Sequence, residues 1–404
     1  MKTNQNNNVY KLVDCQARAR KEHYGVAIIG AGIYGCHLAL ALKARGHKVD
    51  IYDMSDDLFS GASTYNSFRI HKGYHYPRSG KTREMCMRDE KEFTEFYGHL
   101  TSNAQDNPKI FCVANDERTL IDFSTMKFIM QGSGLPFEEL SLEELNRLGF
   151  ESIEGGFRVH ESIFLVDKAK KWFKQELLNK GVNLKLRQCI DKIETDSNKK
   201  INIANEEYDF AINCTYNQAL SYHSRRHCHY FDLCFSLIVA SKRPKEECNI
   251  KSFGIFDGAY PSLEPYGYSV LPEKYAAYHD RKLFQIFHVK HTSVCQYAHI
   301  ENARIGQSNG LDSKQLADLT HKILSDTKFF FPRFDEEFEV IGHCLALKTK
   351  VNDLSDTRPL IVVSDEEQHP HFIQVFSSKL TSIFTAEEQV MKIIDQSHKK
   401  LLAA

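Results

Sequence analysis

A short apolar run followed by three glycines constrains the fold of this chain more than any other feature. Residues 26–29, Val-Ala-Ile-Ile, have the character of a strand buried on both faces of a parallel sheet. The pattern Gly30-x-Gly32-x-x-Gly35 follows at once, and a helical stretch over residues 37–45 comes next. A strand, a glycine loop and a helix in this order predict the opening of a βαβ unit.

Each glycine has its own physical role in such a loop. Gly30 allows a tight turn, Gly32 lets the backbone approach a pyrophosphate, and Gly35 permits close packing of the helix on the strand. The N-terminus of the following helix would then stabilise the phosphate charge, and Ile33 and Tyr34 of the loop are candidate cofactor contacts. A glycine-rich turn that binds nothing is the alternative, but the strand before the loop and the helix after it favour dinucleotide binding.

An acidic residue stands where a dinucleotide site requires one. A second predicted strand over residues 48–53 ends in Asp53, 23 residues after Gly30. Its carboxylate would accept hydrogen bonds from ribose hydroxyls. The same charge would repel a 2′-phosphate, so the sequence disfavours NADP.

The composition of the 404 residues excludes several classes of protein. The 52 Lys and Arg residues nearly cancel the 53 Asp and Glu residues, which argues against binding nucleic acid or a membrane surface through the overall field. Hydrophobic residues make up 42%, as in folded globular chains of two or three domains. The 11 cysteines include no CxxC pair, so we expect reduced thiols and a cytoplasmic protein.

The start of the chain predicts neither a signal peptide nor an anchor. Residues 1–22 are polar and rich in Asn, so we expect a disordered tail. No window reaches the apolar length that a membrane span needs, and no membrane partner is expected. His223 and His227 have the spacing of two metal ligands, but Arg225 and Arg226 lie between them, so we expect no metal site.

The remaining periodicities predict the other elements in outline. Helices are expected at 83–99, 167–180 and 313–327, from Thr385, and, as a short helix, from Ser141. Strands are expected at 110–113, 127–130, 183–190, 191–195, 200–203, 209–213, 234–242, 268–271, 283–291, 339–349 and 372–376. Ser141 with Glu144 and Thr385 with Glu388 have the spacing of helix capping boxes.

Three further motifs accompany the glycine loop, and together the four resemble one family. They are Gly61-Ala-Ser63-x-x-Asn66-x-x-Arg69-Ile-His71-Lys-Gly73-Tyr74-His75-Tyr, the strand end Ala211-Ile-Asn-Cys-Thr215, and Arg358-Pro359 followed by residues 377–381. With these motifs the sequence resembles the D-amino-acid-oxidase-like family of FAD-dependent oxidoreductases. The resemblance extends over most of residues 25–395, weakly outside the motifs, and the family prefers glycines where Ser377 and Ser378 stand.

The resemblance implies an α/β fold: a Rossmann-like FAD-binding domain with an inserted antiparallel-sheet substrate domain. The FAD-binding domain is predicted at 23–100, 150–222 and 350–404, and the substrate domain at 101–149 and 223–349. FAD is the implied cofactor. Besides the glycine loop and Asp53, the implied contacts are Ser63, Asn66, Arg69, His71 and Gly73 along the diphosphate and flavin, Ile190 and Thr215 at the nucleotide half, and Ser378, Lys379, Leu380 and Thr381 before the last helix. The N-terminus of that helix would stabilise reduced flavin.

Candidate catalytic residues come from the same motifs. His71, Tyr74 and His75 can hydrogen-bond near the flavin, although each could merely position its loop. By resemblance, Arg358 would anchor a substrate carboxylate, unless it pairs with a nearby aspartate. Lys348, which ends an apolar strand, would stabilise negative charge as oxygen accepts electrons, unless it only reaches out to water.

The function predicted from these motifs is removal of hydride from a CH–NH carbon of an amine or amino acid. Oxidation of a CH–OH group, in a hydroxy acid or a sugar-linked alcohol, is the first alternative. A flavin-containing nucleic-acid-modifying protein is an alternative from another class, although the near-neutral charge opposes it and we expect no nucleic-acid partner. An NAD dehydrogenase is the remaining enzyme alternative. The expected partners are a small-molecule substrate and oxygen or another electron acceptor.

Overall fold

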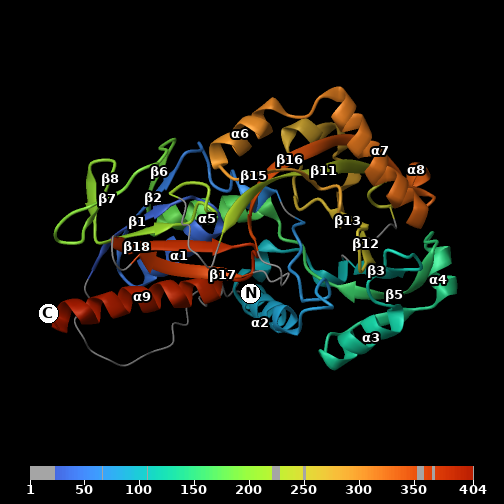
Figure 1. The fold of residues 1–404 in the computed structure, drawn as a ribbon, viewed down its shortest axis with the longest axis horizontal. Coiled ribbons are helices and arrows are strands. Elements are labelled where there is room, and N and C mark those ends of the chain that lie inside the picture. Colours follow the sequence, from blue (N-terminus) through green and yellow to red (C-terminus); the bar gives the residue numbers. More distant parts are fainter. Residues whose placement is uncertain are drawn as a thin grey trace, which may run out of the picture.

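The computed structural model describes residues 23–65, 67–106, 108–220, 228–248, 252–352, 359–365 and 369–403, and these form two large sheets that lie beside each other (Figure 1). The first sheet has the strand order β17-β18-β10-β1-β2-β6. Its strands are β1 (Gly25–Ile29), β2 (Lys48–Asp53), β6 (Asn183–Leu186), β10 (Phe210–Asn213), β17 (Leu360–Asp365) and β18 (His369–Ser377). All pairs are parallel except β17–β18, as in a dinucleotide-binding sheet.

The apolar run of β1 is continuous because both faces of this sheet are covered. Val26 and Ile28 pack with α1 (Ile33–Ala44), α5 (Val166–Asn179) and α9 (Ile383–Ala403). Ala27 and Ile29, which alternate with them, pack under the three-stranded sheet. That sheet consists of β7 (Glu194–Thr195), β8 (Ile201–Ile203) and β9 (Glu206–Tyr208). The layered arrangement leaves the carboxyl ends of the parallel strands for a ligand.

The second sheet is mostly antiparallel and has nine strands, in the order β15-β11-β14-β13-β12-β3-β5-β4, with β16 also paired to β11. The strands are β3 (Pro108–Ala114), β4 (Glu138–Leu140), β5 (Ile153–His160), β11 (His229–Pro244), β12 (Ser252–Phe256), β13 (Pro261–Pro265), β14 (Arg281–His288), β15 (Ser293–Tyr297) and β16 (Phe338–Val351). Its helices are α3 (Phe123–Gly132), α4 (Leu142–Arg147), α6 (Ile300–Asn309), α7 (Ser313–Phe330) and α8 (Phe334–Glu337). Helix α2 (Gly80–Tyr97) lies between the two sheets in Figure 1.

The fold class predicted from the sequence is confirmed, with corrections in detail. The boundary at residue 150 is too early, because β5 pairs with β3 and β4 in the second sheet. Residues 127–130 are helical rather than extended: Asp122 caps α3, and Met126 and Met130 are both buried one turn apart. Residues 268–271 form no strand.

The two predicted capping boxes have different outcomes. Ser141 and Glu144 form the box at the start of α4, as predicted. Helix α9 begins at Ile383, two residues before Thr385, so the second box is wrong. The Thr385 hydroxyl instead accepts a hydrogen bond from Arg88 of α2. A capping pattern inside a helix cannot be distinguished from a true cap by spacing alone.

Close packing of α1 on β1 predicts that Gly35→Ala will destabilise the protein. A Cβ on Gly35 would lie 1.9 Å from the backbone oxygen of Gly30, and backbone cannot move aside cheaply. We expect a loss of about 3 kcal/mol in the free energy of unfolding, measured in urea. The matched control is Gly132→Ala in α3, where a Cβ meets nothing within 4 Å. It should be neutral or stabilise by about 0.5 kcal/mol, and equal losses in both variants would contradict the packing argument.

Candidate cofactor and substrate site

The glycine turn at the end of β1 has the geometry that a dinucleotide requires. Gly30 has φ +107°, and a Cβ there would lie 2.7 Å from the Cys214 carbonyl oxygen at the end of β10. Only glycine therefore fits where the two central strands end. The next residues bring the backbone around into α1, so the start of this helix faces the edge where both strands terminate.

The N-terminus of α1 is open toward this edge. Gly32 is the N-cap residue and supplies no side-chain cap. The Ile33 N–H instead donates to the Ser63 hydroxyl at 3.1 Å, from the loop that follows β2. Backbone N–H groups that donate to an oxygen atom here could equally donate to a phosphate oxygen. The residues present therefore fit the pyrophosphate of a dinucleotide.

Asp53 is fixed at the end of β2. One carboxylate oxygen accepts from the Ala31 N–H at 2.7 Å, and the other accepts from the Ser55 N–H at 2.8 Å. Each carboxylate oxygen can accept a further hydrogen bond. The group can therefore hold its position beside the glycine turn with acceptor capacity to spare, and its contact with ribose hydroxyls stays a prediction.

The other predicted cofactor contacts also gather at the carboxyl ends of the strands. Thr215 follows β10, where its hydroxyl donates to Asn213 at 2.7 Å. The loop after β18 contains Ser378, which is exposed, Leu380, which is half-buried, and Lys379 and Thr381, which are buried. The Tyr34 hydroxyl of α1 donates to the Lys379 carbonyl at 2.6 Å, so this loop is held against the glycine turn and leads into α9.

A cleft marks the outer end of this edge. It has a volume of about 370 Å³ and lies between the loops around Ile190 and Thr215 and helix α6 of the other sheet. Cys189 and Asp191 line it, whereas the Ile190 side chain is buried beneath the three-stranded sheet. Arg304 of α6 crosses the cleft and donates to the Gln218 carbonyl at 3.1 Å. This position suits the nucleotide half of a dinucleotide.

The loop after β2 carries two stacked imidazoles. The rings of His71 and His75 lie 4.5 Å apart, and His71 faces the Glu161 carboxylate at 3.6 Å. Burial, followed by the charge of Lys109, lowers the pKa of His75 well below its ordinary value, so His75 is neutral. Burial alone would raise the pKa of Glu161, but the adjacent His71 ring and the positive charges of Arg69 and Lys109 bring it down to about 2. Glu161 is therefore a carboxylate at neutral pH.

A network of four buried charges joins this loop to the second sheet. The Arg69 guanidinium donates to Glu264 of β13 at 2.8 Å and also bonds the Ser252 hydroxyl of β12. Lys109 of β3 pairs with the other oxygen of Glu264. Glu161 supplies the second negative charge and accepts the Lys72 N–H at 2.8 Å. Lys109, Glu161 and Glu264 were not predicted as site residues, and their only sequence signal is a lone charge within or beside an apolar strand.

The loop residues differ in what their side chains can reach. The Arg69 guanidinium donates hydrogen bonds to the Glu264 carboxylate and to the Glu161 backbone carbonyl. Its predicted contact with the cofactor therefore stays a prediction. Tyr74 is fully buried in the core around Phe111, and its hydroxyl donates to the Pro136 carbonyl. A core position of this kind gives no support to a catalytic hydroxyl. Gly73 has φ +118° and lies against the Arg83 backbone, so its glycine character is needed for the turn.

Two predicted site residues, Asn66 and Arg358, lie outside the described residues, as do His223 and His227. Lys348 is described, and it lies on β16 with its ammonium 5.5 Å from the centre of the Phe287 ring. No carboxylate of the described residues lies within ion-pair distance of it. Among the parts of the chain that the structure describes, no cluster of His, Cys, Asp and Glu could hold a metal ion, and no helix is long and apolar enough to cross a membrane.

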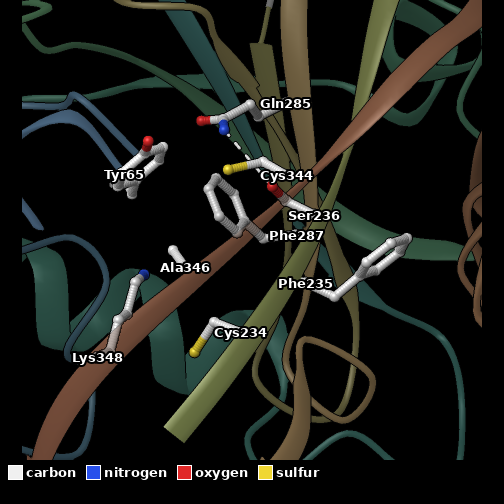
Figure 2. Close-up of a pocket in the computed structure, with 9 residues that line it drawn as sticks. All are labelled: Tyr65, Cys234, Phe235, Ser236, Gln285, Phe287, Cys344, Ala346 and Lys348. Carbon is white, nitrogen blue, oxygen red and sulfur yellow. Dashed lines mark hydrogen bonds between the residues drawn. The ribbon is translucent and has the colours of Figure 1, made fainter. Parts of the chain in front are cut away.

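Lys348 lines a pocket on the face of the second sheet that meets the first. The pocket lies between Tyr65, from the loop after β2, and strands β11, β14 and β16 (Figure 2). Its lining consists of Tyr65, Cys234, Phe235, Ser236, Gln285, Phe287, Cys344, Ala346 and Lys348. The polar groups of Gln285 and Lys348 both turn toward the side where Tyr65 lies.

Comparison with known proteins agrees with this geometry. The family model described as FAD dependent oxidoreductase matches residues 25–229, just over half of the chain. The chain belongs to the FAD dependent oxidoreductase family. The resemblance seen in the motifs is therefore confirmed, and the cofactor of this enzyme is FAD. When bound, FAD would supply the acceptor for one hydride, which carries two electrons.

Relatives and solved structures extend the likeness over the whole chain. The chain is 29% identical to the FAD-dependent monooxygenase FPY4 of Fusarium mangiferae, over 92% of its own length and 91% of the relative's. It is 25% identical to the FAD-dependent monooxygenase kojA of Aspergillus flavus, over 92% and 85%. Its fold is similar to L-alpha-glycerophosphate oxidase from Mycoplasma pneumoniae with FAD bound, with TM-score 0.67, 13% identity and coverage of 93% and 95%. Glycine oxidase from Geobacillus kaustophilus gives TM-score 0.65, 13% identity and coverage of 92% and 94%.

Gly32→Val should remove FAD while leaving the protein folded. The only neighbour of a Cβ at Gly32 is the Ser63 hydroxyl at 3.2 Å, and Gly32 has φ −74°, which valine can adopt. The valine side chain would instead occupy the path of the pyrophosphate. We expect colourless protein with an unchanged circular dichroism spectrum. A folded variant that retains its full flavin absorbance would contradict the assignment of this turn to the pyrophosphate.

Glu264→Gln should destabilise the protein strongly. The change leaves Arg69 and Lys109 buried without their common carboxylate, which costs about 3–5 kcal/mol. The matched control is Glu138→Gln, which removes an exposed pair with Arg158 and should cost about 1 kcal/mol or less. Urea unfolding of both variants provides the measurement. If they lose similar amounts, the network does not hold the two sheets together.

Proposed function

We propose that this enzyme removes hydride from the CH–NH carbon of an amine or amino acid. The observation that carries the proposal is the chemistry of the pocket in Figure 2. Among the described residues that line it, the hydrogen-bonding groups are neutral, the one charge is the ammonium of Lys348, and there is no carboxylate or imidazole. The pocket therefore favours a neutral or negatively charged substrate group over a cation.

This lining suits an amine because an amine loses hydride only in its neutral form, when the nitrogen lone pair is free. A carboxylate in the pocket would stabilise the protonated amine, and the ammonium of Lys348 does the reverse. An alcohol would instead need a base to accept its hydroxyl proton as the hydride leaves. None of the described lining residues is an ordinary base of that kind, so the pocket supports CH–NH oxidation over CH–OH oxidation.

A second candidate is a monooxygenase. It is favoured by the names of the relatives that match nearly the whole chain, both of which are FAD-dependent monooxygenases. Such an enzyme would place one oxygen atom in its substrate and reduce the other to water. Its flavin would need a separate reductant, such as a nicotinamide, whereas a CH–NH oxidase takes its electrons from the substrate.

Anaerobic mixing of the purified enzyme with candidate substrates and reductants distinguishes these functions, because reduction by the true electron donor bleaches the flavin absorbance. Amines and amino acids should bleach the flavin in the absence of any other reductant. The reduction rate should rise with pH through the pKa of the substrate amine, because the neutral form reacts. Bleaching by 2-hydroxy acids or glycerol phosphates alone would support CH–OH oxidation. Bleaching by NADH or NADPH alone would support the monooxygenase.

Lys348→Met should slow the reaction of reduced flavin with oxygen by about tenfold or more, because a cation stabilises the negative charge that oxygen acquires. Anaerobic reduction by the substrate should change much less. The matched control is Lys274→Met, since Lys274 is an exposed lysine on the same side of β16 that does not line the pocket. Stopped-flow measurement of both half-reactions tests the role. Unaltered reoxidation would show that Lys348 does not assist oxygen.

A further inference from the structure

One buried side chain of the pocket has an unmet hydrogen bond. Gln285 lies on β14 directly opposite Glu264 of β13, on the sheet face that receives Arg69. Only 2% of its surface is exposed. Its amide nitrogen is 3.5 Å from the Ser236 hydroxyl, a long contact, and its amide oxygen has no hydrogen-bond partner.

The neighbours of Gln285 cannot satisfy that oxygen. Both carboxylate oxygens of Glu264 are held by Arg69 and Lys109, and an ionised carboxylate has no proton to donate. A buried carbonyl oxygen without a partner is costly, so such atoms are rare unless they receive a ligand or water. The position of Gln285 beside a fully paired network therefore makes its free oxygen a distinctive feature of the pocket.

The orientation of the amide follows from the charge that it faces. Rotating the amide by half a turn would place the nitrogen toward the pocket and let the oxygen accept from Ser236. However, the pocket contains the ammonium of Lys348, and a positive charge favours the oxygen end of the amide dipole. Figure 2 shows the oxygen of Gln285 turned toward the side of Tyr65, while its nitrogen is turned toward Ser236.

An amide oxygen is suited to an amine that must stay neutral. It accepts an N–H hydrogen bond, yet it carries no full charge and so does little to stabilise the protonated amine. A carboxylate at the same place would bind the amine more strongly in the form that cannot lose hydride. The neutral acceptor of Gln285 thus fits the requirement that the proposed function places on the pocket.

We propose that the side-chain oxygen of Gln285 accepts a hydrogen bond from the substrate nitrogen, and that the enzyme thereby selects primary and secondary amines over tertiary amines. This inference rests on the proposed function. A neutral tertiary amine has no N–H to donate, so it would leave the buried oxygen unpaired. Gln285 is then a residue that contacts the substrate and determines its class.

The test compares a secondary amine that bleaches the flavin with its N-methylated tertiary counterpart. The wild-type enzyme should bind the secondary amine at least about tenfold more tightly, as judged from the concentration dependence of anaerobic flavin reduction. Gln285→Met, which keeps the size and removes the acceptor, should reduce this preference to about twofold or less. Gln296→Met is the matched control, since Gln296 is exposed on β15 of the same sheet. It should keep the wild-type preference.

A second readout separates binding from a structural role. Because Gln285→Met removes a buried polar atom that has no partner, the unfolding temperature of the FAD-loaded protein without substrate should not fall. If the Met variant does not fold, Gln285→Asn withdraws the amide from the pocket and should show the same loss of preference.

The outcomes that overturn the inference are distinct. If amines bleach the flavin and Gln285 variants keep the full preference, the role of Gln285 is wrong while the proposed function stands. If no amine bleaches the wild-type flavin, the proposed function and the inference fail together.

Discussion

The buried network of Arg69, Lys109, Glu161 and Glu264 is the interaction on which the site depends. It holds two positive and two negative charges at 4% exposure or less, and it spans the loop after β2 and strands of the second sheet. Charges buried to this degree must keep their partners, because an unpaired one costs several kcal/mol. The network therefore allows one relative position of the loop and the sheet. The pocket between Tyr65 and β16 has a defined shape for that reason.

The two sheets divide the chemistry between them. The carboxyl ends of the parallel strands provide the glycine turn, the open helix N-terminus and Asp53, all of which serve a dinucleotide whatever the substrate. The face of the antiparallel sheet provides the side chains that line the pocket proposed for the substrate. This separation explains how glycine oxidase and glycerophosphate oxidase can have a fold similar to that of this chain. Fold alone does not select among such reactions, and the pocket residues carry that information.

Two polar groups give the pocket its character. Lys348 brings one positive charge, and Gln285 brings a neutral acceptor without a partner. Under the proposed function, both groups would favour a substrate nitrogen in its uncharged state, because the cation opposes protonation and a neutral amide does little to stabilise the protonated form. The imidazoles of His71 and His75 do not line the pocket. Burial keeps His75 neutral, and the carboxylate of Glu161 lies 3.6 Å from His71. Their positions suit the support of the cofactor loop more than proton transfer in the pocket.

The sequence by itself determined the cofactor half of this protein. The run 26–29, the three glycines and Asp53 are close together in the chain, and their roles depend on local backbone geometry. Strand β2 begins and ends at the residues predicted, and the family resemblance rested on the same local motifs. The role of Gly30 needed one distant contact, with Cys214, but the dihedral angle that requires glycine is local.

Only the tertiary structure decided the substrate half. Gln285, Glu264 and Arg69 are far apart in the sequence, and strand pairing brings them to one face. A lone glutamine in a strand gives no signal, because its meaning lies in the hydrogen bond that its neighbours fail to supply. The same limit applies to β5 and to Tyr74, since sheet membership and burial depend on long-range packing. Local patterns specify local geometry, whereas pairing between distant segments specifies which side chains share a pocket.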